Sequence, residues 1–153
     1  MGEPLLEVKD LKVSFQVNKN LLTAVDGVNF TLEEGRVLGI VGESGCGKSV
    51  TATSIMRLVP PSVSIIDSKS QILFRGEDLA KATEARMRQV RGSEISMIFQ
   101  EPMSSLNPVY RIGDQMIEMI RSHDKKISRA DALARCVQML GRVGIPSPEQ
   151  RVK

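Results

Sequence analysis

One short stretch of the sequence has residue types and spacing that suit the binding of a phosphate group. Residues 42–49 read GESGCGKS and match the pattern G-x-x-x-x-G-K-[ST] at every fixed position. Glycines allow the backbone to wrap closely around a phosphate and to direct successive N–H groups at its oxygens. The lysine brings a mobile positive charge, and the serine brings a hydroxyl ligand for Mg²⁺. We expect a nucleotide phosphate to contact the following residues: Gly42, Glu43, Ser44, Gly45, Cys46, Gly47, Lys48, Ser49 and Val50.

The flanking sequence places this pattern between a strand and a helix. Residues 36–41 (RVLGIV) are apolar on both faces, as in a parallel strand that is covered on both sides. From Lys48 the sequence suits a helix until Pro60 and Pro61, because proline lacks an N–H group and disfavours helix in the residue before it. Such a helix directs the positive end of its dipole at the phosphate. This context argues against a chance match in a glycine-rich turn.

Other roles for the stretch have less support. A dinucleotide-binding loop has the spacing G-x-G-x-x-G, whereas residues 42–47 have G-x-x-G-x-G. Cys46 occupies a variable position of the phosphate pattern, so the pattern gives no reason to assign it as a catalytic nucleophile. A nucleotide kinase would also need a mobile lid and a second substrate site, and the sequence has no pattern for either.

Several other segments before position 100 predict strands. Residues 5–15 and 28–34 alternate between apolar and polar side chains, which is typical of half-buried antiparallel strands. Residues 26–27 (Asp-Gly) between them predict a tight turn. Residues 70–79 predict a strand and a turn, and residues 95–100 (ISMIFQ) predict a short buried strand.

Two amphipathic helices are predicted near the end of the chain. Residues 112–122 form the first, and its apolar face is expected to contain Ile112, Met116, Met119 and Ile120. The second begins with a capping box of Ser128 and Asp131 and ends before Gly144 and Pro146. Its apolar face is expected to contain Leu133, Cys136, Val137 and Leu140.

Composition and charge restrict the class of protein. The chain has 153 residues, of which 41% are hydrophobic and 25% charged, and it lacks both a bilayer-spanning apolar run and a signal-peptide pattern. We therefore expect one cytosolic globular domain or part of one. The net charge is −2 over residues 1–120 and +5 over residues 121–153. A solvated helical face explains the basic end, and with only 3% aromatic residues nucleic acid is not an expected partner.

With these motifs the chain resembles the N-terminal half of an ATP-binding subunit of an ABC transporter of the oligopeptide/dipeptide importer type. The matching segments are VKDLKVSF, AVDGVNFTLEEGRVLGIVGESGCGKS, SQILFRGEDL and ISMIFQEPMSSLNP. The implied fold is α/β, a P-loop NTPase core of the ABC type with an N-terminal antiparallel β subdomain. Residues 1–109 would form the nucleotide-binding core, and residues 110–153 the beginning of the helical subdomain.

The resemblance implies ATP and Mg²⁺ as ligands and assigns roles to further residues. Phe15 resembles the aromatic residue on which this family stacks the adenine ring. Gln100 resembles the glutamine of the Q-loop, whose side-chain oxygen can join the Mg²⁺ shell, so Ser49 and Gln100 are the expected metal ligands. Gln100 would support the reaction, and no catalytic residue is expected within the chain.

The resemblance also implies partners, a location and a function. A second ATP-binding subunit, the same or different, would pair with this one, and membrane permease subunits would contact residues 101–109 and the helical subdomain. An extracytoplasmic peptide-binding protein would act indirectly. The subunit would lie on the cytoplasmic face of the membrane as a peripheral protein and use ATP to power peptide import. The coupling surface is expected to include Pro102, Ser104, Ser105, Leu106 and Pro108.

Some parts of the family pattern have no match in the sequence. These are the signature loop of L-S-G-G-Q type, the second acidic motif and the switch histidine, so we expect a truncated chain that is inactive on its own. Residues 63–67 (VSIID) imitate the acidic motif, but a serine interrupts them, so Asp67 is not assigned to metal binding. Glu101 is not assigned to hydrolysis, and His123 is expected to be a surface residue.

Two questions stay open in the sequence. Nickel and glutathione importers share the SLNP tetrapeptide at residues 105–108, so the transported substrate is not decided. A soluble ABC-type ATPase of DNA repair or translation is the alternative function, and the SLNP loop favours the transporter.

Overall fold

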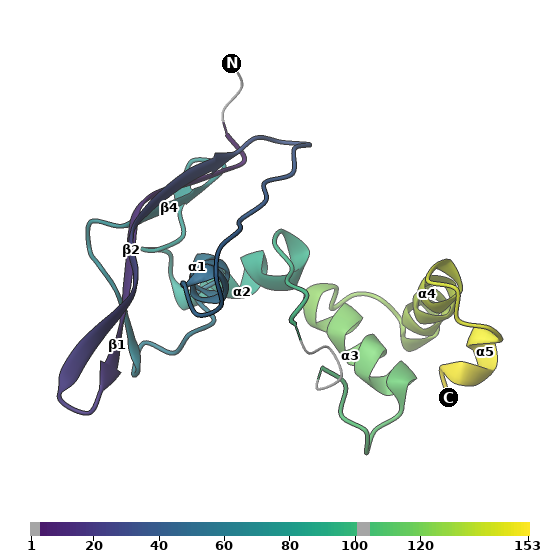
Figure 1. The fold of residues 1–153 in the computed structure, drawn as a ribbon. Helices are drawn as coiled ribbons and strands as arrows, with labels where there is room; N and C mark the ends of the chain where they lie inside the picture. Colours follow the sequence, from purple (N-terminus) through teal and green to yellow (C-terminus); the bar gives the residue numbers. More distant parts are fainter. Residues whose placement is uncertain (1–3, 101–104) are drawn as a thin grey trace. The chain divides into compact units, whose positions relative to one another are not determined.

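The computed structural model describes residues 4–100 and 105–153, which form two compact units, Met1–Ile95 and Ser96–Lys153 (Figure 1). The elements of the first unit are β1 (Leu6–Val17), β2 (Asn20–Leu32), α1 (Lys48–Ile55), β3 (Ser64–Ile66), β4 (Gln71–Phe74), β5 (Glu77–Asp78) and α2 (Glu84–Ser93). The second unit contains α3 (Ile112–His123), α4 (Arg129–Arg142) and α5 (Pro148–Arg151).

A long antiparallel hairpin of β1 and β2 forms the frame of the first unit. The pairing runs from Leu6 with Leu32 to Val17 with Asn20, so the chain turns at residues 18–19. Asn18 has a φ of 57°, a left-handed conformation that asparagine tolerates better than most residues. The strand expected at residues 5–15 is confirmed as β1.

The tight turn expected at residues 26–27 is wrong, because these residues lie inside β2. The register pairs at Val25 and Val28 enclose one residue of β1 but two residues of β2, so residues 26–27 form a β-bulge. Gly27 has a φ of 68°, which accommodates the extra residue. The strand expected at residues 28–34 is therefore the second half of a longer strand that begins at Asn20.

Three short strands complete the sheet, whose order is β2-β1-β4-β5, with β3 also paired to β1. All of these neighbours run antiparallel. The strand and turn expected at residues 70–79 are confirmed as the β4–β5 hairpin, in which Arg75 and Gly76 both have positive φ. The VSIID segment contains β3, which the sequence did not predict, so its apolar residues belong to a strand beside β1.

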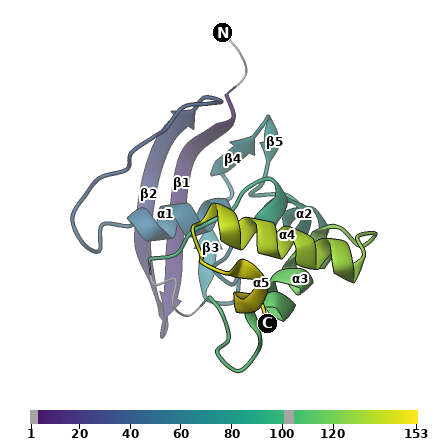
Figure 2. The same ribbon diagram turned by 90° about the vertical axis from the view of Figure 1, so that its right-hand side faces the viewer.

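One hydrophobic core joins the sheet to the helices of this unit. Helix α1 contacts both β1 and β2, and it crosses them in Figure 2. Helix α2, which the sequence analysis did not predict, contributes Met87 and Val90 to the core, and the hydroxyl of Thr83 caps it by accepting from the N–H of Arg86. The buried core residues are Val8, Leu11, Val13, Val25, Ile72, Phe74, Leu79, Met87 and Val90.

The two segments expected to be buried strands do not form strands. Residues 36–41 have no strand partner among the described residues, and Val37 is 97% exposed. In residues 95–100, Ile95 makes an isolated bridge with Arg91, whereas Ile98 is 93% exposed. A strand needs neighbours that satisfy its backbone N–H and C=O groups, and the described part of the chain offers none here.

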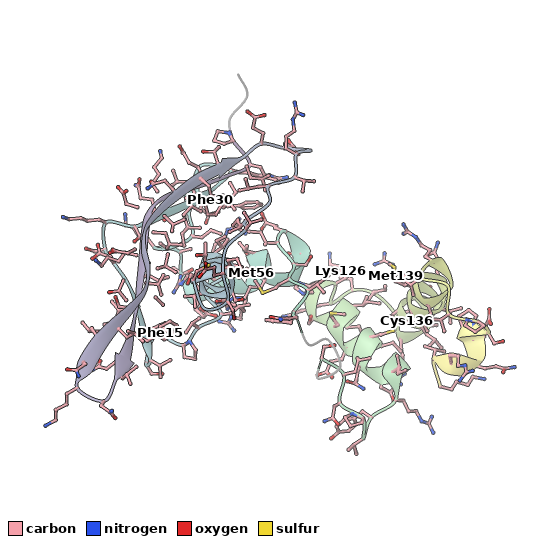
Figure 3. All side chains as sticks on the ribbon, viewed as in Figure 1. Phe15, Phe30, Met56, Lys126, Cys136 and Met139 are labelled. Carbon is pink, nitrogen blue, oxygen red and sulfur yellow. The ribbon has the colours of Figure 1, made fainter. Side chains whose placement is uncertain are left out.

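The second unit is a small helical cluster around Ile117, Ala132, Cys136 and Val152. The predicted capping box at the start of α4 is confirmed, because the Ser128 hydroxyl accepts from the N–H of Asp131 at 3.1 Å and donates to its carboxylate at 2.7 Å. Cys136 lies on α4 one turn before Met139, which is half exposed (Figure 3). In residues 4–100 and 105–153, no helix is both long and apolar enough to cross a membrane.

The predictions of which residues form the apolar faces of α3 and α4 are partly wrong. On α3 the buried residues are Gly113 and Ile117, whereas Ile112 and Met119 are exposed. Gly113 donates its N–H to the carbonyl of Val152 at 3.0 Å, and a side chain at 113 would collide with that carbonyl. The close approach of the chain after α5 therefore sets which face of α3 is covered. On α4, Leu133 is exposed, while Cys136 is buried as expected.

Candidate phosphate-binding site

Residues 42–49, called the glycine-rich loop below, lead directly into α1. The helix begins at Lys48, and Gly47 is its N-cap residue with a φ of 94°. Gly45 is also left-handed, with a φ of 80°. A Cβ atom at position 47 would lie 2.5 Å from the backbone oxygen of Ala24 in β2, so the loop approaches the sheet more closely than any residue except glycine permits.

The charged group of the loop is the ammonium of Lys48. Its Nζ atom donates to the backbone carbonyls of Gly42 at 2.7 Å and of Glu43 at 2.6 Å, and it lies 3.5 Å from the Cys46 sulfur. The loop therefore curls around its own lysine. This arrangement places one positive charge inside a curve of backbone.

The first turn of α1 adds backbone donors to the same place. No side chain of the described residues caps this helix start, and the first turn has no acidic residue. Thr51 tightens the turn, since its N–H and its hydroxyl both donate to the Gly47 carbonyl, at 2.8 Å and 3.0 Å. Ser49 and Val50 lie in this turn, at the positive end of the helix dipole.

Two arginines that the sequence analysis did not single out hold the other end of α1. Arg91 of α2 donates from Nε to the carbonyl of Met56 and from Nη2 to that of Arg57, both at 2.8 Å. Arg57 in turn donates to the carbonyls of Leu79 and Ala82. The helix was expected to continue to Pro60, but it ends at Ile55, because Arg57 is left-handed with a φ of 49°.

The same arginine affects an acidic neighbour. Glu84 pairs with Arg91 at 2.5 Å, and the hydrogen bond from this guanidinium lowers the pKa of the carboxyl group. Glu84 therefore stays ionised to a lower pH than an isolated glutamate. The sequence signal that could have found this helix is Thr83 followed by Glu84, a cap residue and an acidic first turn.

A cavity of about 570 Å³ lies beside the glycine-rich loop. Val28 and Phe30 of β2 form one wall, Leu38 and Ile40 form another, and Lys48 is part of the lining. The lining is therefore mostly apolar, and its two charged residues are Lys48 and Asp26.

Phe15, the residue expected to stack on adenine, does not line this cavity in the described part of the chain. It lies on β1 nearer to the hairpin tip than Phe30 (Figure 3). Its side chain is half-buried, and its strand partners are Leu22 and Ser64.

The other residues considered as site residues from the sequence do not lie in the glycine-rich loop. Gln100 is exposed and belongs to the second unit, while Glu101, Pro102 and Ser104 lie outside the described residues. The carboxylate of Asp67 accepts from the N–H of Lys69 at 2.9 Å, a turn contact that explains this aspartate structurally. The prediction that His123 is a surface residue is confirmed. Among the described residues no group of three His, Cys, Asp or Glu side chains is placed to hold a metal ion.

Comparison with protein families gives one match that covers most of the chain. The family model described as ABC transporter matches residues 25–152. The matched range includes the glycine-rich loop, both arginines that hold α1, and nearly all of the second unit.

Curated relatives are similar over almost the whole chain. The oligopeptide transport ATP-binding protein OppD of Bacillus subtilis (strain 168) is 50% identical over 148 residues, which are 97% of this chain and 41% of the relative. The dipeptide transport ATP-binding protein DppD of the same organism is 47% identical over 152 residues, which are 99% of this chain and 44% of the relative. The chain thus spans less than half the length of these relatives.

Solved structures show the same fold at low sequence identity. The dimeric structure of MJ0796, a bacterial ABC transporter cassette, matches with a TM-score of 0.71 and 19% identity, over 89% of this chain and 57% of that chain. A post-hydrolysis state of MJ0796 bound to ADP and Pi matches with a TM-score of 0.66 and 17% identity, over the same shares. The expected α/β cassette fold is confirmed.

Proposed function

Because the chain belongs to the ABC transporter family, we propose that it is the part of an ATP-binding subunit that holds the phosphates of MgATP. We further propose that the whole protein hydrolyses ATP to power the import of peptides. The names of similar relatives support this, since they are oligopeptide, dipeptide or peptide transport ATP-binding proteins at 43–50% identity.

The observation that carries the proposal is the glycine-rich loop at the start of α1. Its left-handed glycines, the uncapped N–H groups of the first turn and the Lys48 ammonium all suit a phosphate chain. Ser49 provides a hydroxyl of the kind that Mg²⁺ binds in such loops. Mg²⁺, when bound, would neutralise part of the charge on the β- and γ-phosphates. The donor set therefore fits MgATP.

Two further site assignments belong to the same proposal. Gln100 would add a neutral oxygen ligand to the metal shell, and its exposed side chain is compatible with that role. Phe15 would stack on the adenine ring, and its half-buried position on β1 leaves part of the ring accessible.

The partners proposed for the whole protein are a second ATP-binding subunit and permease subunits at the cytoplasmic face of a membrane, with a peptide-binding protein acting from outside. Exposed apolar side chains support a docking role for the segment before α3. In this segment Val109 is 84% exposed and Tyr110 is 65% exposed, and Leu106 is also exposed. Apolar residues gathered at a surface are typical of protein contacts.

The test is calorimetric titration of MgATP into the full-length protein and its Lys48→Ala variant. We expect the variant to bind about tenfold more weakly or worse, a loss of about 1.4 kcal/mol, because a charge-assisted contact to phosphate is removed. Lys69→Ala is the matched control, since Lys69 is exposed in a turn away from the loop. Equal affinity in the Lys48 variant and the parent would overturn the phosphate-site assignment.

A further inference from the structure

The side chain of Gln115, on α3, holds the segment that precedes this helix. Its Oε1 atom accepts a hydrogen bond from the backbone N–H of Asn107 at 2.8 Å. Its Nε2 atom donates to the backbone carbonyls of Asn107 at 3.0 Å and of Tyr110 at 3.1 Å. The Asn107 side chain in turn accepts from the N–H of Val109 at 3.0 Å. One half-buried amide therefore fixes both ends of residues 107–110.

This set of contacts is specific to glutamine. The backbone partners decide the orientation of the amide, because an N–H group faces its oxygen and two carbonyls face its nitrogen. Among long side chains only glutamine carries an acceptor and two donors on one flat group. Glutamate could still accept from Asn107, but its second oxygen would face two carbonyl oxygens. Leucine would make none of these bonds.

The support for this segment is rigid. Helix α3 is anchored in the core of the second unit through Ile117, two residues after Gln115. Gln115 therefore holds the segment that carries the exposed apolar residues Val109 and Tyr110. A segment that is ordered before binding loses less conformational entropy when a partner docks.

We propose that Gln115 is a positioning residue for permease docking, which fixes residues 107–110 in the shape that the permease recognises. This inference rests on the proposed function, in which the segment meets the permease. Gln115 has no role in holding ATP in this proposal. Its loss therefore weakens docking and leaves the phosphate site intact.

The first arm of the test measures the contacts of Gln115 directly by amide hydrogen exchange in the full-length protein. We expect exchange at Asn107 to become about tenfold faster in Gln115→Leu, because the acceptor for this N–H is lost. Gln115→Glu keeps that acceptor and should show a smaller increase. The matched control is Gln138→Glu, which makes the same change of charge at an exposed position of α4 where no side-chain hydrogen bond is present among the described residues.

The second arm measures ATP hydrolysis by the transporter assembled with its permease in proteoliposomes. We expect permease-stimulated hydrolysis in Gln115→Leu to fall about fivefold or more at limiting permease, with the Kd for MgATP within about twofold of the parent. Excess permease should restore the rate, because only the ordering of the docking segment has changed. Gln138→Glu should behave as the parent.

The outcomes separate this inference from the proposed function. Unchanged exchange at Asn107 in Gln115→Leu would overturn the positioning role, whatever the transporter does. Faster exchange with full permease-stimulated hydrolysis at limiting permease would overturn the link to docking. If ATP hydrolysis by the parent protein never depends on permease, the proposed function is overturned, and the docking role with it. The hydrogen-exchange measurement would still show whether Gln115 holds residues 107–110.

Discussion

The glycine-rich loop and the segment directly before it differ in what holds them in place. Within the loop the contacts are local, since Lys48 binds the carbonyls of Gly42 and Glu43, and Thr51 binds that of Gly47. Residues 36–41 have no strand partner in the described part of the chain, and their valines are almost fully exposed. A loop that leads into a helix can form from neighbouring residues, whereas a strand exists only beside another strand.

The largest expected difference comes from replacing one glycine by alanine in each of the two regions, as two separate variants. Gly47→Ala should destabilise the protein by about 1–3 kcal/mol and abolish MgATP binding, because residue 47 is left-handed and its Cβ would press on Ala24. Gly39→Ala should change the free energy of unfolding by less than about 0.5 kcal/mol, since no atom of the described residues lies within 4 Å of a Cβ at that position. Urea unfolding and calorimetry measure both. Equal destabilisation by the two variants would show that residues 36–41 are packed, and the contrast would fail.

The next effect concerns the remote end of α1. Arg91→Ala should destabilise the first unit by about 1–2 kcal/mol, because the carbonyls of Met56 and Arg57 lose their donors. The affinity for MgATP should also fall, because the anchoring of α1 positions the glycine-rich loop. Arg88→Ala is the control, as Arg88 is exposed on the same helix. If both variants unfold at the same urea concentration as the parent, the loop and α1 do not depend on this contact.

The smallest effect compares the two cysteines by their rates of reaction with a thiol reagent. Cys46 is exposed in the glycine-rich loop, while Cys136 is buried in α4, where burial raises the pKa of its thiol. Cys46 should therefore react faster, by about tenfold or more, because the thiolate is the reacting species and needs access.

Saturating MgATP extends the cysteine experiment. It should slow the reaction at Cys46 and leave the rate at Cys136 unchanged, since the phosphates would fill the loop that carries Cys46. Mass spectrometry of each peptide gives both rates. Protection of both cysteines to the same degree would point to a general stabilisation by ATP and against occupation of the loop.

Two elements with local signals were predicted correctly from the sequence. The glycine-rich loop and the start of α1 follow from glycine and lysine spacing, and the start of α4 follows from Ser128 and Asp131. Helix α2 also has such a signal in Thr83 and Glu84, but it was not recognised. The bulge at residues 26–27 could not be distinguished from a turn, because aspartate and glycine suit both and only the partner strand decides.

The sequence by itself determined which chemistry to expect at the candidate site, since a phosphate pattern needs only residue types in a fixed order along one short stretch. The tertiary structure alone decided which apolar residues are covered. Residues 36–41 have the composition of a buried strand and stay exposed, and residues 95–100 are only partly covered. Helix α3 buries Ile117 but leaves Met119 in solvent. The same is true of the contacts that Arg91 and Gln115 make with backbone carbonyls and N–H groups, which carry no side-chain signal. Burial and such contacts depend on which segments meet in space, and the residue pattern of one segment does not contain that information.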